Sequence, residues 1–230
     1  MIHVILMKSK KNTIVCKELL NNILKKFMKS YREYMMDRIL RSPNGAYFIN
    51  LLKKGEYEPH GLLLHLLVKT GFELGIITLP ELKITLKKPI DRCELGLTCS
   101  KDRRLIKSVK ADVVFHITSQ DIGIGEVVSG MLHHGYSSKE LYEHLKKTRK
   151  KVDGEVTTRD KLLHLAKHNS EVNFFVLIIY IGNEERFHLR IRRRTWIDIW
   201  KKTIDELSKI RPTKALFIRG IEEPIFEIYP

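Results

Sequence analysis

Apolar residues recur every three or four positions in several parts of the chain, which is the period of an amphipathic helix. This pattern predicts four helices, over residues 13–41, 59–73, 158–167 and 195–210. A further helix is expected over residues 137–151, because serines suited to an N-cap precede a polar, lysine-rich stretch. The helix over 59–73 is apolar almost throughout, so we expect it to be buried against a sheet.

Strand patterns occupy the middle of the chain and two segments near its end. Residues 82–87 alternate between apolar and polar side chains, which predicts a strand that Pro89 should end. Similar runs predict that an antiparallel meander is completed by short strands over 94–99, 110–117 and 123–128. The unbroken apolar run 174–181 predicts a fully buried central strand. Residues 214–219 predict an edge strand, followed by an extended tail.

The order of these elements is a helix, a strand meander, a pair of helices, a buried strand, a helix and a final strand. Such mixing predicts a single domain of the α/β class. We expect residues 1–57 to form an N-terminal helical extension and residues 58–230 to form the α/β core. No internal repeat or low-complexity linker interrupts the sequence.

The charge of the chain points to a polyanionic partner. Lys and Arg number 42 against 27 Asp and Glu in 230 residues, which gives a formal net charge of +15. Nucleic acid is the polyanion that such a basic protein most often binds. No apolar run is long enough to span a membrane or to form the core of a signal peptide. We therefore expect an intracellular (cytoplasmic) protein that binds DNA and has no membrane partner.

Two basic segments are candidates for contact with DNA phosphates. One is an arginine run just before Trp196, and the other is the lysine-rich helix expected over 137–151. The predicted nucleic-acid-binding residues are Arg190, Arg192, Arg193, Arg194, Lys146, Lys147 and Lys150. Guanidinium groups match pairs of phosphate oxygens. The alternative interpretation of both segments is a solvated surface.

Two carboxylates stand out because they lie in segments whose pattern favours strands. Asp112 opens an apolar strand and Glu126 lies within the next one, where acidic residues are unusual. Carboxylates on adjacent strands can converge, and they repel each other unless a cation lies between them. Mg²⁺ or Mn²⁺ would suit such a site, because hard cations prefer carboxylate oxygens. The alternative is that both residues end their strands and point to solvent.

These strands and the helix before them resemble the PD-(D/E)xK nuclease superfamily, in particular the archaeal Holliday-junction resolvases and related archaeal viral nucleases. Residues 111–114, Ala-Asp-Val-Val, stand where that family has Pro-Asp and an apolar strand. Residues 125–129, Gly-Glu-Val-Val-Ser, stand where it has Glu-x-Lys. The resemblance covers residues 58–182 and implies a restriction-endonuclease-like core that acts as a homodimer. It also implies Mg²⁺-dependent cleavage of DNA, with branched DNA as the expected substrate.

The resemblance assigns roles to individual residues. Asp112 and Glu126 would bind the metal ion, and they would carry out catalysis together with a base. In the resolvases the helix before the strands carries a glutamate at its start. At that place this chain has Glu58 and His60, either of which would complete the ligands of the metal.

One departure concerns the catalytic lysine of the family, because this chain has Val128 at that place. Three explanations stay open. Lys139, at the start of the helix expected next, takes over its role; His60 acts as the base instead; or the site is degenerate. The expected function is therefore a metal-dependent DNA endonuclease. A non-catalytic nucleic-acid-binding protein is the alternative, and an adaptor for an acidic protein is a third hypothesis.

Overall fold

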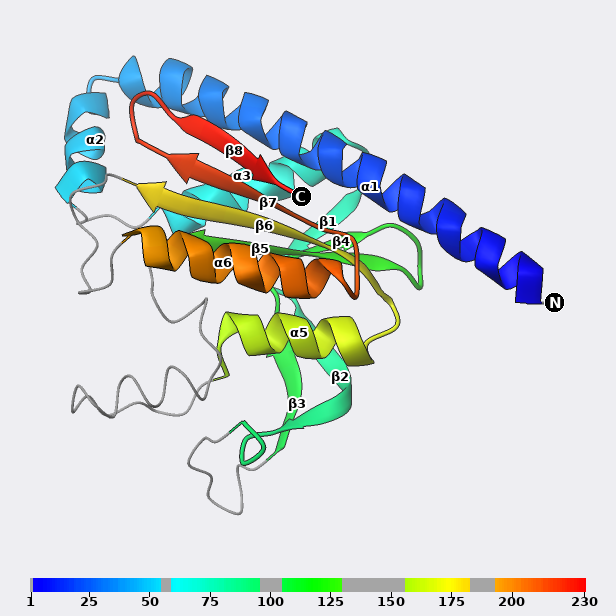
Figure 1. Ribbon diagram of the computed structural model, residues 1–230. Coiled ribbons are helices and arrows are strands. Elements are labelled where there is room, and N and C mark those ends of the chain that lie inside the picture. Colours follow the sequence, from blue (N-terminus) through cyan, green and yellow to red (C-terminus); the bar gives the residue numbers. More distant parts are fainter. Residues whose placement is uncertain (1, 55–58, 96–104, 130–155, 183–192) are drawn as a thin grey trace.

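The computed structural model describes residues 2–54, 59–95, 105–129, 156–182 and 193–230. Within these ranges the protein is a mixed α/β fold built on a six-stranded sheet (Figure 1). The strand order is β1 (Ile77–Pro80), β4 (Val113–His116), β5 (Ile122–Ser129), β6 (Val172–Gly182), β7 (Thr213–Arg219) and β8 (Ile225–Tyr229). β6 runs parallel to both of its neighbours, β5 and β7, and the remaining pairs are antiparallel.

Helices cover both faces of this sheet (Figure 1). One set consists of α1 (Ile2–Glu33), the π-helix that continues it (Tyr34–Leu40), α2 (Gly45–Lys54) and α3 (His60–Glu73). The other set consists of α5 (Thr158–His168) and α6 (Arg193–Ser208). Because β5 and β6 are parallel, the chain must cross over the sheet between them, and α5 lies in that connection.

The side chains of β6 explain why its sequence is apolar without alternation. Phe175 and Leu177 face the core that contains α5 and α6. Phe174 and Val176 face the core that contains α1 and α3. Both faces of the strand are therefore buried, as is typical of a strand with parallel neighbours on both sides.

A separate two-stranded ribbon extends beyond the sheet beneath α5 (Figure 1). It consists of β2 (Lys83–Asp91) and β3 (Leu105–Lys110), which pair in antiparallel fashion. Ile84 and Val109 lie opposite each other and pack into the same core as Leu162 of α5. The ribbon ends near the two acidic residues, because β3 ends at Lys110, two residues before Asp112.

The helices predicted over 13–41, 59–73, 158–167 and 195–210 are confirmed, as is the mixed α/β class. The buried central strand predicted at 174–181 is also confirmed. The helix expected over 137–151 lies outside the described residues, as does most of the strand expected over 94–99.

Some details of the strand prediction are wrong. β2 continues through Pro89, because the pairing with β3 breaks between Thr85 and Ile90 and the proline needs no ladder hydrogen bond there. β7 is not an edge strand, because the tail pairs with it as β8. The expected meander is divided: β2 belongs to the separate ribbon, and β1 pairs with β4 instead.

The N-terminal helices share a core with the sheet. Leu20 and Phe27 of α1 are fully buried, and they pack in the same cluster as Leu67 of α3 and Ile178 of β6. The segment expected to form a helical extension therefore covers one face of the sheet, and a boundary at residue 57 stays a prediction. No helix in the described ranges is both long and apolar enough to cross a bilayer.

The close approach of α3 to β1 at Gly71 can be tested. A Cβ atom at Gly71 would overlap the Thr78 side chain, and it would lie 3.1 Å from the Phe115 ring. We expect Gly71→Ala to lower the free energy of unfolding by about 1–3 kcal/mol in urea denaturation. Gly61→Ala in the same helix is the control, because a Cβ there meets no described atom within 4 Å. It should stabilise the fold by up to ~1 kcal/mol, and equal losses in the two variants would contradict this packing.

Candidate active site

Strand pairing brings Asp112 and Glu126 together. Val113 of β4 lies opposite Gly125 of β5, so the residues just beyond this pair are neighbours. The Asp112 N–H donates to Oε1 of Glu126 at 3.4 Å, and the Val127 N–H donates to Oδ2 of Asp112 at 2.8 Å. The interpretation of both acids as solvent-facing strand ends is therefore wrong for Glu126, which is 2% exposed.

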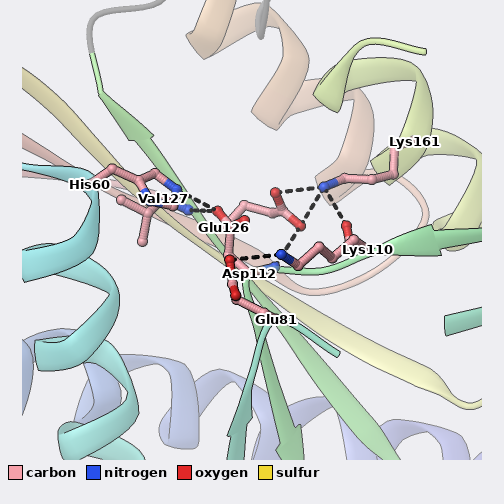
Figure 2. A network of polar contacts seen from close by, with 7 residues as sticks. All are labelled: His60, Glu81, Lys110, Asp112, Glu126, Val127 and Lys161. Atoms are coloured by element: carbon pink, nitrogen blue, oxygen red, sulfur yellow. Dashed lines mark hydrogen bonds and ion pairs between the residues drawn. The ribbon is translucent and has the colours of Figure 1, made fainter. Parts of the chain in front are cut away.

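His60 joins this pair from the first residue of α3. Its Nε2 lies 3.3 Å from Oδ2 of Asp112 (Figure 2). The helix can pack this close because β5 has a glycine at position 125, where a Cβ would come within 2.9 Å of Leu67. Glycine at this position therefore helps to place the start of α3 over the acidic residues.

A lysine outside the predicted set completes the site. Lys161, in the first turn of α5, places its Nζ 2.7 Å from both carboxylate oxygens of Glu126 (Figure 2). The same Nζ donates to the main-chain carbonyl of Lys110 at 2.9 Å. The Thr157 hydroxyl caps the helix by accepting from the Asp160 N–H, which fixes where this turn begins.

The sequence contains one signal for this lysine. Lys139 is the predicted surrogate because it opens a helix that follows the Glu126 strand. The same reasoning applied to the helix predicted over 158–167 selects Lys161. Lys139 and Lys161 differ in their distance along the chain from Glu126. That distance does not indicate which of the two helices packs on β5.

The environment pushes the pKa values of the two acids apart. Burial raises the pKa of Glu126 to about 7, and the charge of Asp112 adds to this rise, although Lys161 opposes it. Burial would also raise the pKa of Asp112. Hydrogen bonds from His60 and the Val127 N–H, together with the charge of Lys161, outweigh burial and lower that pKa. Two neighbouring acids with separated pKa values are typical of sites that handle protons or bind a cation.

The donor set can be compared with what a divalent cation needs. Mg²⁺ is usually held by one or two carboxylates and keeps several waters. Asp112 and Glu126 meet this requirement, and a cation between them would relieve the repulsion from Asp112 that adds to the effect of burial on the pKa of Glu126. Among the residues the structure describes, no three His, Cys, Asp or Glu side chains form a metal-ligating group. A third protein ligand for the ion would have to come from elsewhere.

The other predicted site residues cannot be compared with this geometry. Glu58, Lys139, Lys146, Lys147, Lys150, Arg190 and Arg192 lie outside the described residues. Arg193 and Arg194 begin α6, but their side chains are outside the described set. Comparisons of the chain with protein-family models, with curated proteins and with solved structures found no match.

The raised pKa of Glu126 predicts a pH dependence of stability. The folded protein holds this proton more tightly than an unfolded glutamate with the ordinary value of 4.5. Glu126 therefore stabilises the fold most below about pH 4.5, and this contribution is lost as the pH rises through about 7. The full loss is about 3 kcal/mol. The lowered pKa of Asp112 acts in the opposite direction, but only at pH values below its ordinary 3.8.

Urea denaturation between pH 5 and 8, with a chelator present, checks this expectation. Glu126→Gln cannot titrate, so its stability should fall less with rising pH than that of the wild type. Glu81→Gln is the matched control, because Glu81 pairs with Lys110 in the same network but is 56% exposed. That variant should keep the wild-type slope. Parallel curves for the wild type and Glu126→Gln would show that Glu126 does not titrate in this range.

Proposed function

We propose that this protein is a metal-dependent DNA endonuclease of the PD-(D/E)xK type, in which Lys161 takes the place of the motif lysine. One observation carries the proposal: the Lys161 amine lies 2.7 Å from both oxygens of the buried Glu126, next to Asp112. Two acids and an amine are the groups that the motif brings together. Here the amine comes from the crossover helix α5, and the strand position of the motif holds Val128.

The arrangement of elements supports a restriction-endonuclease-like core. That core is expected to contain a helix, an antiparallel strand meander, a second helix and a central strand. α3 is followed by the antiparallel series β1, β4 and β5, then by α5 and the parallel strand β6. Asp112 precedes β4 and Glu126 lies on β5, as the resemblance requires of the two acids.

The chemistry assigns a task to each side chain. Asp112 and Glu126 would hold Mg²⁺ or Mn²⁺, which when bound supplies positive charge against the phosphate and a more acidic water. Lys161 would position the attacking water or a phosphate oxygen through its amine. His60 contacts Asp112, and its side chain is 37% exposed. An imidazole in this position can exchange protons with the solvent.

The net charge of +15 supports DNA as the partner. The resemblance to Holliday-junction resolvases further favours branched DNA and a homodimer, because a junction presents two symmetric strands for cleavage.

A second candidate function is a nucleic-acid-binding protein without catalysis. The observation that favours it is that Lys161 and Glu126 already satisfy each other. The Lys161 amine donates to both carboxylate oxygens of Glu126. The two side chains are only 14% and 3% exposed. Such a pair satisfies a buried carboxylate without any metal, so it can serve as a purely structural link between α5 and β5.

Cleavage assays separate the two candidates. The wild type should cut linear duplex, single-stranded or four-way DNA in Mg²⁺ or Mn²⁺. Asp112→Asn, Glu126→Gln and Lys161→Ala should each slow cutting by about 100-fold or more, because each removes an ion ligand or the amine. Lys202→Ala, an exposed lysine of α6, is the control and should cut normally.

Lys139→Ala belongs in the same series. A normal rate for this variant, with a slow rate for Lys161→Ala, would assign the lysine role to α5. Normal rates for both would leave His60 as the base. A wild type that binds DNA but cuts none of these substrates with either ion would overturn the endonuclease and leave the binding protein.

The arginine run predicts the salt dependence of DNA binding. Replacing Arg192, Arg193 and Arg194 with alanine should weaken binding, because phosphate contacts release counterions. The slope of log affinity against log salt should fall by about 0.9 for each phosphate that the protein no longer neutralises. A triple lysine variant at these positions keeps the charge and should retain most of the slope. An unchanged slope in the alanine variant would reassign the run to a solvated surface.

A further inference from the structure

A basic cluster continues from the candidate active site along α5. Lys161, His164 and His168 are spaced by three and four residues, so they share one face of the helix. The two imidazole rings lie 4.6 Å apart, centroid to centroid. Nε2 of His164 lies 2.5 Å from the main-chain oxygen of Lys88 on β2. The cluster is therefore built from the crossover helix and the β2–β3 ribbon.

The charges that act on His168 are positive, whereas Asp160, four residues before His164 on α5, is an acidic residue on the His164 side of the helix. The pKa of His168 is lowered by burial and by its neighbours His164, Lys88 and Lys167. Both lysines are exposed. Within the described parts of the chain, neither imidazole is hydrogen-bonded to a carboxylate. Four basic side chains of the cluster therefore have no hydrogen-bonded acidic partner among the described residues: Lys88, His164, Lys167 and His168.

Other basic side chains on α5 and near it are already paired with acidic residues. Lys87 of β2 pairs with Glu171 at 2.8 Å, and Arg159 pairs with Glu206 of α6 at 2.8 Å. Arg211 donates through its Nε to the Ala166 carbonyl. These contacts leave His164, His168, Lys88 and Lys167 as the described basic groups of this face that are open to an external anion.

We propose that Lys88, His164, Lys167 and His168 form a phosphate-binding subsite for the DNA strand that enters the Asp112–Glu126 site. The inference rests on the proposed binding of DNA. His168 lies about 10 Å along the helix from Lys161, which is the rise of about three nucleotides at ~3.4 Å each. The subsite would therefore hold the backbone within a few nucleotides of the scissile phosphate.

The ligand favoured here is an anion. Two histidines four residues apart on a helix can also chelate a transition metal. Lys88 and Lys167 oppose that role, because nearby positive charges disfavour a bound cation as they disfavour imidazolium. A phosphate has the opposite effect: it favours imidazolium, so DNA binding should take up protons and should strengthen as the pH falls.

The experiment is a titration of labelled duplex DNA with the full chain at pH 5.5 and 7.5, at fixed salt and with a chelator present. The chelator excludes both cleavage and a metal bridge. The wild type should bind about tenfold more tightly at pH 5.5, from two added charge contacts. The double variant His164→Gln/His168→Gln should lose most of this gain while it keeps the affinity at pH 7.5. His65→Gln, an exposed histidine of α3, is the control and should keep the full gain.

Two further variants test the subsite while both histidines stay in place. Lys88→Gln and Lys167→Gln should each weaken binding at both pH values and should each lower the salt slope by about one. Circular dichroism checks that each variant is folded. Unchanged affinity in both lysine variants, or a full pH gain in the double histidine variant, would overturn the subsite.

The subsite and the endonuclease can fail separately, because binding is measured without divalent ions. Loss of the pH gain in a protein that never cuts DNA would support the subsite and reject the nuclease. Normal cleavage, together with a full pH gain in the double histidine variant, would do the reverse. A pH gain seen only with RNA would reject DNA as the occupant.

Discussion

The buried ion pair between Lys161 and Glu126 is the interaction on which the arrangement of this protein depends. A carboxylate that is 2% exposed in the middle of a sheet is costly unless a partner satisfies it. Lys161 contacts both of its oxygens, and it also contacts the Lys110 carbonyl at the end of β3. One amine therefore joins the crossover helix, the central sheet and the ribbon. Removing either member of a buried pair usually costs about 3–5 kcal/mol, whereas apolar replacements of both can be neutral. Stability alone does not require such a pair, which is why its position beside Asp112 favours a functional role.

On the opposite face of the sheet, α3 is held in place by close packing at small residues. Gly71 lets α3 approach β1, and Gly125 lets Leu67 approach β5. These two contacts hold the helix whose first residue, His60, reaches Asp112. The acidic pair is thus contacted by a basic side chain from each layer: His60 from the α3 layer and Lys161 from the α5 layer.

The sequence predicted those parts of the fold that are encoded locally. The helices follow from periodicity, and the buried strand at 174–181 follows from its unbroken apolar run. Asp112 and Glu126 stand out because acids are unusual in apolar strands. Long-range pairing was harder to predict. β1 and β8 are short strands with partly exposed side chains, so only their neighbours β4 and β7 define them. Lys161 was missed for a related reason: a lysine on an amphipathic helix is usually solvated, and only the docking of α5 onto β5 shows that it is buried.

In the proposed nuclease Lys161 takes the place of the motif lysine, and the faces of β5 explain how a helix can supply that amine. Side chains two residues apart on a strand share a face, so Val128 faces the same layer as Glu126. Val128 is buried in the core formed with α5 and α6, and Val127 lies in the opposite core. A lysine at position 128 would therefore extend from the strand into the space beneath α5. Lys161 reaches the same layer from the helix above, and its amine meets Glu126 there. The proposed reaction needs an amine beside the two acids, and in this fold either the strand or the crossover helix could supply it.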